Sequence, residues 1–189
     1  MSRESSSSQI FCLLAKLLDY PSEESSKLLE ELIKKVPRHD LLGIRELFRD
    51  LFTAQELYTR TFDFSEKTTL YLTFYYSGYT RDRGLELLRL KEILEKHGVT
   101  PEKRRQLPDY LPLLLELVCR DYSNIMILAR YRQAIEIIGK RLREEKNPYS
   151  ALFEVLLELI PKTQSELRVE EKLRIEVGGL GESYEFSLN

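Results

Sequence analysis

Apolar residues recur at helical spacing along most of this chain. In the first such segment five apolar residues fall on one helical face: Ile10, Leu13, Leu14, Leu17 and Leu18. Pro21 ends this helix, because the residue before a proline disfavours helical backbone. The same spacing predicts further helices over about residues 22–36, 41–51, 53–62, 65–77, 80–97, 110–120, 123–145 and 148–160. We therefore expect a single all-α domain over residues 9–165, preceded by a polar, serine-rich and disordered N-terminus over residues 1–8.

The pattern changes from helical spacing to alternation near the C-terminus. After Glu166 the apolar residues alternate on both sides of a Gly-Gly-Leu-Gly stretch: Leu173, Ile175, Val177, Tyr184, Phe186 and Leu188. This pattern predicts a short β-hairpin within a C-terminal tail, residues 166–189. Because an isolated hairpin is marginal in water, it needs a surface to pack on.

The stretch LPDYLP, residues 107–112, begins an apolar segment with two prolines. If Asp109 is the helix N-cap, Pro112 falls in the first turn, where a missing N–H group costs no intrahelical hydrogen bond. The following residues are too apolar for a surface helix, so we expect this helix to lie centrally. Capping alone explains the motif; the alternative is that its rigid start holds Asp109 and Tyr110 at the rim of a cleft.

The stretch TRDRG, residues 80–84, begins another helix with two arginines, although the helix dipole disfavours cations there. In one interpretation Arg81 and Arg83 pair with carboxylates of the fold, and Gly84 permits close helix packing. In the other, the arginines and the glycine backbone face a partner. Aromatic residues crowd the preceding segment, and we expect most in the core and some tyrosines at a surface: Tyr71, Phe74, Tyr75, Tyr76 and Tyr79.

Composition excludes several classes of function. The 29 basic and 31 acidic side chains nearly cancel, so no long-range field would recruit nucleic acid or an anionic membrane surface. We expect neither a nucleic-acid partner nor membrane insertion, because no apolar run approaches the roughly 20 residues of a membrane span. The start of the chain also lacks the pattern of a secretory signal.

Candidate chemistry is sparse. Cys12 and Cys119 are isolated in leucine-rich stretches, so we interpret them as free thiols of a cytoplasmic protein. Together with two distant histidines they do not make a zinc site. No nucleophile elbow, phosphate-binding loop or dinucleotide fingerprint is present. We therefore expect no enzyme activity, no metal and no cofactor.

Five segments together resemble one family. They are LLDYP (17–21), FDFSEKTTLYLTFYYSGYTRDRG (62–84), EKHG (95–98), LPDYLPLLLEL (107–117) and NPYSALFEVLLEL (147–159). Over about residues 9–160 the chain resembles the NarJ-type assembly chaperones, the delta subunit of nitrate reductase, within the TorD/DmsD group. The resemblance implies an all-helical, non-catalytic protein. Such a protein binds the N-terminal peptide of a molybdopterin oxidoreductase catalytic subunit and holds it ready for cofactor insertion.

Two motifs carry the resemblance to particular positions. The RDRG motif of the family falls on residues 81–84 and its LPDHLP motif on residues 107–112, with Tyr110 in place of histidine. This substitution removes any imidazole role there. The resemblance implies a client of the nitrate, dimethyl-sulfoxide or polysulfide reductase type. The tail lacks the longer acidic stretch that is typical of the family, so within this class we expect a dimethyl-sulfoxide or polysulfide reductase instead of nitrate reductase.

We expect the two motifs to lie side by side and frame an apolar groove between the 66–77 and 110–119 helices. A client peptide would bind there as an amphipathic helix, with Arg81, Asp82, Asp109 and Tyr110 as polar anchors. The full set of predicted peptide-binding residues is Tyr75, Tyr76, Arg81, Asp82, Arg83, Gly84, Leu107, Pro108, Asp109, Tyr110, Pro112 and Glu116.

A second function stays open on the sequence. A helical scaffold or regulatory subunit, joined permanently to an oxidoreductase complex, could use the tail to add strands to a partner or to a second copy in a homodimer.

Overall fold

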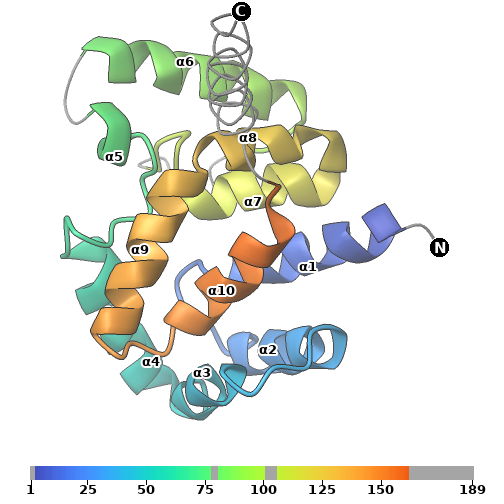
Figure 1. The fold of residues 1–189 in the computed structure, drawn as a ribbon, viewed down its shortest axis with the longest axis vertical. Coiled ribbons are helices and arrows are strands. Elements are labelled where there is room, and N and C mark those ends of the chain that lie inside the picture. Colours follow the sequence, from blue (N-terminus) through green and yellow to red (C-terminus); the bar gives the residue numbers. More distant parts are fainter. Residues whose placement is uncertain (1–2, 78–80, 101–105, 162–189) are drawn as a thin grey trace, which may run out of the picture.

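The computed structural model describes residues 3–77, 81–100 and 106–161, and these residues form a bundle of helices (Figure 1). Its elements are α1 (Arg3–Leu17), α2 (Ser25–Lys35), α3 (Leu41–Leu47), α4 (Leu51–Tyr58), the π-helical turn η1 (Thr59–Asp63), α5 (Phe74–Ser77), α6 (Arg81–Lys96), α7 (Leu111–Arg120), the 3₁₀ turn η2 (Tyr122–Asn124), α8 (Ile125–Arg130), α9 (Arg132–Glu144) and α10 (Ser150–Leu159). Within these ranges the β pairing is one isolated antiparallel bridge between Tyr71 and Tyr110. The all-α prediction is confirmed.

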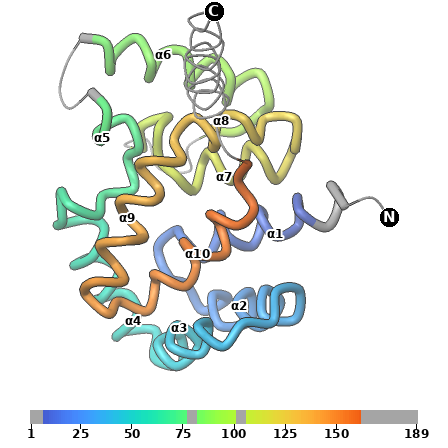
Figure 2. The backbone as a smooth tube through the Cα atoms, in the orientation of Figure 1, coloured from blue at the N-terminus to red at the C-terminus, as the bar shows by residue number. Residues whose placement is uncertain are grey.

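Helix α7 lies at the centre of the molecule. It packs along α1, while α10 packs along α9 and also contacts α1, so that residues from both ends of the described chain enclose the core (Figures 1 and 2). Seven of its side chains are buried: Leu111, Pro112, Leu113, Leu114, Leu115, Leu117 and Val118. The predicted central position of this helix is therefore confirmed.

Several helix boundaries lie close to those predicted, and three others do not. The backbone of α1 is helical from Arg3, so residues 3–8 differ from the expected disordered start. Helix α4 begins at Leu51, before the predicted start at residue 53, because Asp50 caps it: the Asp50 carboxylate accepts hydrogen bonds from the backbone N–H groups of Phe52 and Thr53. The predicted long helix over 123–145 is interrupted at Tyr131, which separates α8 from α9.

The predicted helix over residues 65–77 is wrong except for its last turn, α5. The Leu72 N–H donates to the Asp109 carbonyl oxygen at 3.1 Å, and the Leu111 N–H donates to the Leu70 carbonyl oxygen at 2.9 Å. These two hydrogen bonds align residues 70–72 beside residues 109–111. β-Branched and aromatic residues fill this stretch, and they suit extended backbone as well as helix.

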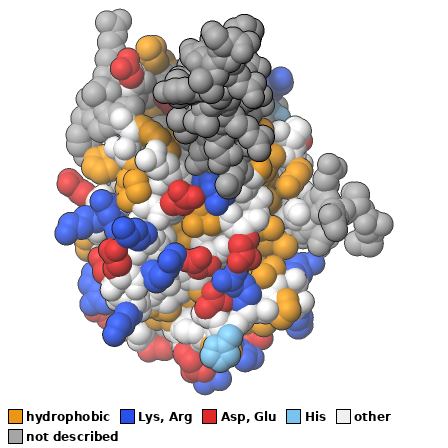
Figure 3. Space-filling view, in the orientation of Figure 1, with side chains coloured by type: hydrophobic (Ala, Val, Ile, Leu, Met, Phe, Trp, Pro, Cys, Tyr) orange, Lys and Arg blue, Asp and Glu red, His pale blue; other side chains and the backbone are white. Residues whose placement is uncertain are grey.

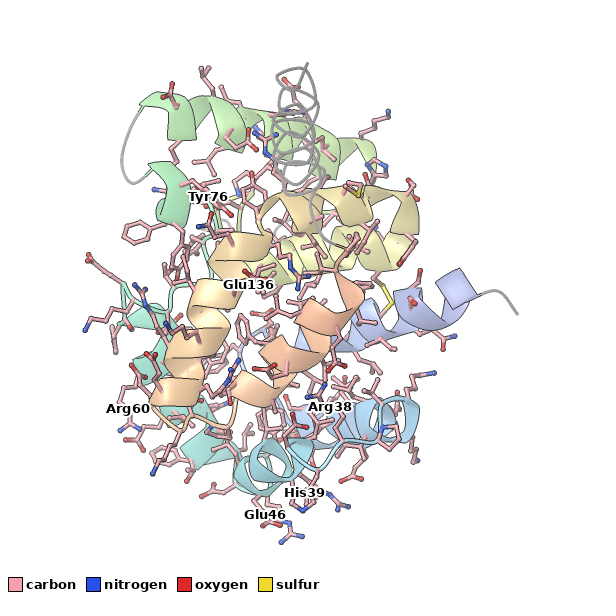
Figure 4. The ribbon with its side chains drawn as sticks, in the orientation of Figure 1. Arg38, His39, Glu46, Arg60, Tyr76 and Glu136 are labelled. Atoms are coloured by element: carbon pink, nitrogen blue, oxygen red, sulfur yellow. A yellow bond between two sulfur atoms is a disulfide. The ribbon has the colours of Figure 1, made fainter. Side chains whose placement is uncertain are left out.

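The interpretation of the two cysteines as free thiols is also wrong. Cys12 of α1 and Cys119 of α7 form a disulfide, with Cα atoms 4.9 Å apart (Figure 4). Their separation of 107 residues gave no sign of pairing, because only the packing of α7 along α1 brings them together.

Some predictions fall on residues outside the described ranges. These are the hairpin within residues 166–189, the position of Tyr79 and the start of the 80–97 helix at Thr80. None of the helices that the structure describes combines the length and the apolar character needed to span a bilayer. On the face shown in the space-filling view, basic and acidic side chains of the described residues lie interspersed (Figure 3).

Candidate functional site: a pocket beside the start of α6

The two sequence motifs meet through a buried carboxylate. Asp109 is fully buried, and its Oδ2 atom accepts hydrogen bonds from the Thr73 backbone N–H at 3.1 Å and the Thr73 hydroxyl at 2.5 Å. The guanidinium of Arg83 lies 3.6 Å from the same oxygen and donates from Nε to the Thr73 hydroxyl at 2.9 Å. The start of α6 and the segment before α7 therefore lie side by side, as the sequence predicted.

The role of Asp109 differs from the prediction in two ways. The N-cap of α7 is Tyr110, with Leu111 and Pro112 in its first turn, so the helix starts one residue later than expected and no side chain caps it. The Asp109 carboxylate faces Thr73 and Arg83 instead. Because it is fully buried, Asp109 does not lie at the rim of a cleft as a polar anchor; it holds α6 against the segment before α7.

A pocket of about 520 Å³ opens next to this junction. It is bounded by residues of α5, α6, α8 and the start of α9, together with the segment before α5: Thr73, Tyr76, Asp82, Leu85, Glu86, Arg89, Arg130 and Tyr131. Asp82, Glu86 and Arg89 follow one another at helical spacing, which places one face of α6 along the pocket. Side chains of both charges and of apolar character are thus combined in one concave surface.

The wall of the pocket opposite to α6 is formed by Tyr76, Arg130 and Tyr131, and hydrogen bonds hold it in place. Glu86 accepts from Arg130 Nη2 at 3.3 Å and from the Tyr131 hydroxyl. Tyr76 packs edge-on against Tyr131 with ring centroids 6.0 Å apart, and its hydroxyl accepts from the Ala134 N–H (Figure 4). Burial, reinforced by the bond to Glu86, raises the pKa of Tyr131 and keeps its hydroxyl a donor. This wall is therefore fixed before any ligand arrives.

The α6 side of the pocket is more accessible. Leu85 is 62% exposed and lies on the face of α6 that borders the pocket. The Asp82 side chain is also exposed, and within the part of the chain that the structure describes it forms no hydrogen bond or ion pair with another residue. An exposed leucine and an exposed carboxylate one turn apart can contact an incoming ligand without breaking an internal interaction.

The structure brings together only part of the predicted site. Tyr76 and Asp82 line the pocket, and Arg83 lies behind it; the side chain of Arg81 is outside the described residues. Tyr75 is half-buried and turns its hydroxyl to the Thr69 carbonyl oxygen at 2.9 Å. Burial raises the pKa of Tyr75.

The remaining predicted residues lie elsewhere. The Tyr110 side chain is buried, and its hydroxyl bonds with the hydroxyl of Tyr58 at 2.8 Å and the carboxylate of Asp19 at 3.1 Å. Burial and the nearby Asp19 charge raise the pKa of Tyr110. With Pro112 and Glu116, Tyr110 lines a smaller cavity of about 250 Å³ between α1 and α7. Leu107 is exposed and Pro108 is half-buried.

The expected groove between the 66–77 and 110–119 helices does not exist in that form. Most of residues 66–77 is not helical, and none of the described residues that line the 520 Å³ pocket belongs to α7. Burial of α7 explains the difference, because a helix enclosed on nearly every side offers no open face. The open surface next to the RDRG motif is bounded by α5, α6, α8 and α9 instead.

Sequence reasoning missed six residues of this pocket: Thr73, Leu85, Glu86, Arg89, Arg130 and Tyr131. The residues from α6 carried a signal, because they lie on the same helical face as Asp82. Arg130 and Tyr131 carried none, since only the tertiary packing of α8 brings them opposite α6. Within the described residues, no three or more His, Cys, Asp or Glu side chains lie together so that they could hold a metal ion.

Gly84 does not serve close helix packing. A Cβ atom at this position would meet nothing within 4 Å, and the residue is exposed on α6. Replacing Gly84 with alanine is therefore expected to raise the free energy of unfolding by about 0.5–1 kcal/mol, because glycine is a poor helix former. Urea denaturation checks this value. A destabilised Gly84→Ala protein would contradict the open position found here.

Comparison with known proteins places this arrangement in a family. A family model described as the nitrate reductase delta subunit matches residues 17–154, which is more than half of the chain. The chain belongs to the nitrate reductase delta subunit family. Both motifs and the whole pocket of this delta-subunit protein lie inside the matched region.

Relatives of this chain are found in Bacillus subtilis and Escherichia coli. A Bacillus subtilis protein named "Probable nitrate reductase molybdenum cofactor assembly chaperone NarJ" is 34% identical, over 78% of this chain and 85% of its own length. The nitrate reductase molybdenum cofactor assembly chaperone NarJ of Escherichia coli K12 is 29% identical, over 85% of this chain and 73% of its own.

A solved structure supports the fold. It is a candidate redox enzyme maturation protein from Archaeoglobus fulgidus, with a TM-score of 0.57 and 19% identity, covering 84% of this chain and 94% of that one. The all-helical fold expected from the resemblance is therefore confirmed.

Proposed function

We propose that this protein is a cytoplasmic, non-catalytic assembly chaperone of a molybdopterin oxidoreductase of the nitrate, dimethyl-sulfoxide or polysulfide reductase type. It binds the N-terminal peptide of the catalytic subunit and holds that subunit ready for insertion of the molybdenum cofactor. The observation that carries the proposal is the pocket beside the RDRG motif, with its exposed leucine and exposed carboxylate. Membership of the delta-subunit family, and the names of the two NarJ relatives, support it.

The chemistry of the pocket suits one face of an amphipathic helix. Leu85 and the rings of Tyr76 and Tyr131 offer apolar contact, which would supply most of the affinity. Asp82 offers a partner for a basic group of the peptide, and Arg89 for an acidic one. A pocket of about 520 Å³ holds a few side chains and not a whole helix, so the rest of the peptide would lie along α6.

Calorimetry tests this proposal. The probe is a synthetic peptide copying the N-terminus of the nitrate reductase catalytic subunit from the organism that encodes this chain. We expect Leu85→Asp to weaken binding at least about 10-fold, because a charge replaces an apolar contact at the centre of the site. We expect a smaller, salt-dependent loss for Asp82→Asn.

Leu42→Asp is the matched control. Leu42 is also an exposed leucine on a helix, but it lies on α3, away from the pocket, so its replacement should leave affinity unchanged. Equal affinities of the wild-type and Leu85→Asp proteins would contradict the site. Absence of binding by the wild-type protein to this peptide and to the corresponding peptides of dimethyl-sulfoxide and polysulfide reductases would contradict the chaperone function and favour a permanent scaffold subunit.

A further inference from the structure

A second cavity, of about 180 Å³, lies where the end of α1, the end of α4, the turn η1 and the bridged residues Tyr71 and Tyr110 meet. Five aromatic rings line it: Tyr20, Tyr58, Phe62, Tyr71 and Tyr110. Two carboxylates, Asp19 and Asp63, line it as well, and none of its described lining residues is basic. It shares no described lining residue with the pocket beside the RDRG motif, so it is a separate candidate site.

The five rings pack against one another and form an aromatic cage. Tyr58, Phe62 and Tyr110 are buried, and the ring centroids of Tyr58 and Phe62 are 5.0 Å apart. The half-buried Tyr71 ring lies against Tyr110 with centroids 5.4 Å apart. Tyr20 is 41% exposed and packs edge-on against Tyr58 with centroids 5.6 Å apart. Because aromatic faces are negative, such a cage attracts a cation, and its volume suits one small group instead of a drug-sized molecule.

The two carboxylates strengthen this attraction. Asp19 is half-buried and follows α1, and Asp63 is exposed at the end of η1. The hydrogen bonds that Asp19 accepts from described residues both end on Oδ1, from the Tyr20 N–H at 2.8 Å and the Tyr110 hydroxyl at 3.1 Å. The Oδ2 atom of Asp19 can therefore accept from a donor that enters the cavity.

The hydroxyl groups of the cage have one proton fewer than the contacts they make. The Tyr110 hydroxyl lies 3.1 Å from the Asp19 carboxylate and 2.8 Å from the Tyr58 hydroxyl. The Tyr58 hydroxyl in turn lies 3.1 Å from the Leu18 carbonyl oxygen. Burial raises the pKa of both tyrosines, so each hydroxyl keeps its one proton, and two protons serve three contacts. A ligand that carries N–H groups can supply the missing donor.

The backbone beside the cage is unusual. The Phe64 N–H donates to the carbonyl oxygen of Thr59, five residues earlier, at 3.1 Å, which makes η1 a π-helical turn. Such turns are rare and are frequent at functional sites. Here the turn contains Phe62 and Asp63, so one ring and one carboxylate of the site depend on it.

We propose that the aromatic cage binds a proton-bearing organic cation, namely an alkylammonium or alkylguanidinium group. The rings contact its charged head, the carboxylates balance its charge, and its N–H groups donate to Asp19 and to the hydroxyls. The cation belongs either to a free small molecule or to a lysine or arginine side chain of another protein. This inference goes beyond the proposed chaperone function and does not depend on the client site.

Nuclear magnetic resonance titration of the full-length protein tests the site with four small probes. n-Butylguanidinium and n-butylammonium carry both charge and N–H groups, tetramethylammonium carries charge alone, and n-butylurea carries N–H groups alone. We expect n-butylurea to bind at least about 10-fold more weakly than n-butylguanidinium, because it is neutral. Tetramethylammonium should bind several-fold more weakly, because it cannot supply the missing donor.

A fifth probe identifies the source of the cation. It is a glycine pentapeptide with a central arginine. Tighter binding of this peptide than of n-butylguanidinium would support the cage as a site for a side chain of another protein. Weaker binding of the peptide would support a free small molecule, because flanking backbone would then hinder entry.

Variants of the cage locate the binding. Asp19→Asn combined with Asp63→Asn should weaken n-butylguanidinium binding at least about 10-fold, while the amides keep the shape of the site. Tyr20→Leu should weaken it several-fold, because one ring face is lost. Glu92→Gln combined with Glu145→Gln is the control: it removes the same charge from exposed positions outside the cavity and should leave the affinity unchanged. Circular dichroism confirms that each variant is folded.

Three results would overturn the site. The first is equal affinity for n-butylguanidinium and n-butylurea, and the second is an affinity that both the aspartate and the Tyr20 variants leave unchanged. The third is an equal loss in the glutamate control and in the aspartate variant, because net charge alone would then explain the binding. Unchanged n-butylguanidinium affinity in Leu85→Asp, whether or not that protein binds the client peptide, would support a site separate from the client pocket.

Discussion

Replacing Asp109 with alanine is expected to lower the free energy of unfolding by about 3 kcal/mol. The carboxylate is fully buried and accepts two hydrogen bonds from Thr73, and it is the buried neighbour of the Arg83 guanidinium. Alanine would leave the backbone N–H and the hydroxyl of Thr73 without their acceptor. It would also remove a negative charge next to the Arg83 guanidinium, of whose side chain only 13% is exposed to solvent. Urea denaturation measures the loss.

Two further variants separate charge from hydrogen bonding at this position. Asp109→Asn keeps an acceptor for Thr73 but removes the charge, so its cost should lie between those of wild type and Asp109→Ala. Asp82→Ala is the control at the start of the same helix, and because Asp82 is exposed its cost should stay below about 0.5 kcal/mol. A cost for Asp109→Ala as small as that of Asp82→Ala would refute the structural role given to the buried carboxylate.

Removing the disulfide is expected to have the largest effect on stability. The Cys12–Cys119 bond closes a loop of 107 residues, and restricting the unfolded chain by a loop of this length stabilises a protein by about 4.7 kcal/mol. Combining Cys12→Ser with Cys119→Ser should therefore lower the melting temperature by roughly 10 °C for a chain of this size. Thermal denaturation followed by circular dichroism measures the shift.

Reduction provides the internal control for the disulfide. A dithiol reductant should lower the melting temperature of the wild-type protein to that of the double serine variant and leave the variant unchanged. Because disulfides are rare in reducing compartments, the bond is also checked chemically. Titration of thiols in protein denatured without reductant counts the cysteines that are free after purification. Two free thiols per chain under those conditions, or a melting temperature insensitive to reductant, would contradict the bond.

The sequence predicted helix boundaries correctly where residues close in the sequence determine them. Helix α10 carries a continuous apolar pattern between two prolines and lies within the predicted range. The helix predicted over residues 80–97 stops before Gly98, and α6 ends at Lys96. Gly98 has a φ of +66°, which is common for a glycine that terminates a helix. In both cases the residues that decide the boundary are neighbours in the sequence.

The failures arose where tertiary contacts outweighed local preference. Residues 70–72 pair with residues 109–111, which the sequence pattern of either stretch could not reveal. The same pairing places Thr73 beside Asp109, so the carboxylate bonds there instead of capping α7. The pocket wall formed by Arg130 and Tyr131 depends on an interruption of a helical pattern that contains neither proline nor glycine at the break.

Photo-crosslinking tests most directly whether the pocket beside the RDRG motif is where a client peptide binds. The probe is the N-terminal peptide of the nitrate reductase catalytic subunit, with a photoreactive group at each apolar position in turn, added to the full-length protein. Mass spectrometry of the products should place the crosslinks on Tyr76, on residues 82–89 and on residues 126–131. Crosslinks confined to α2 and α3, or to the cavity between α1 and α7, would contradict the account.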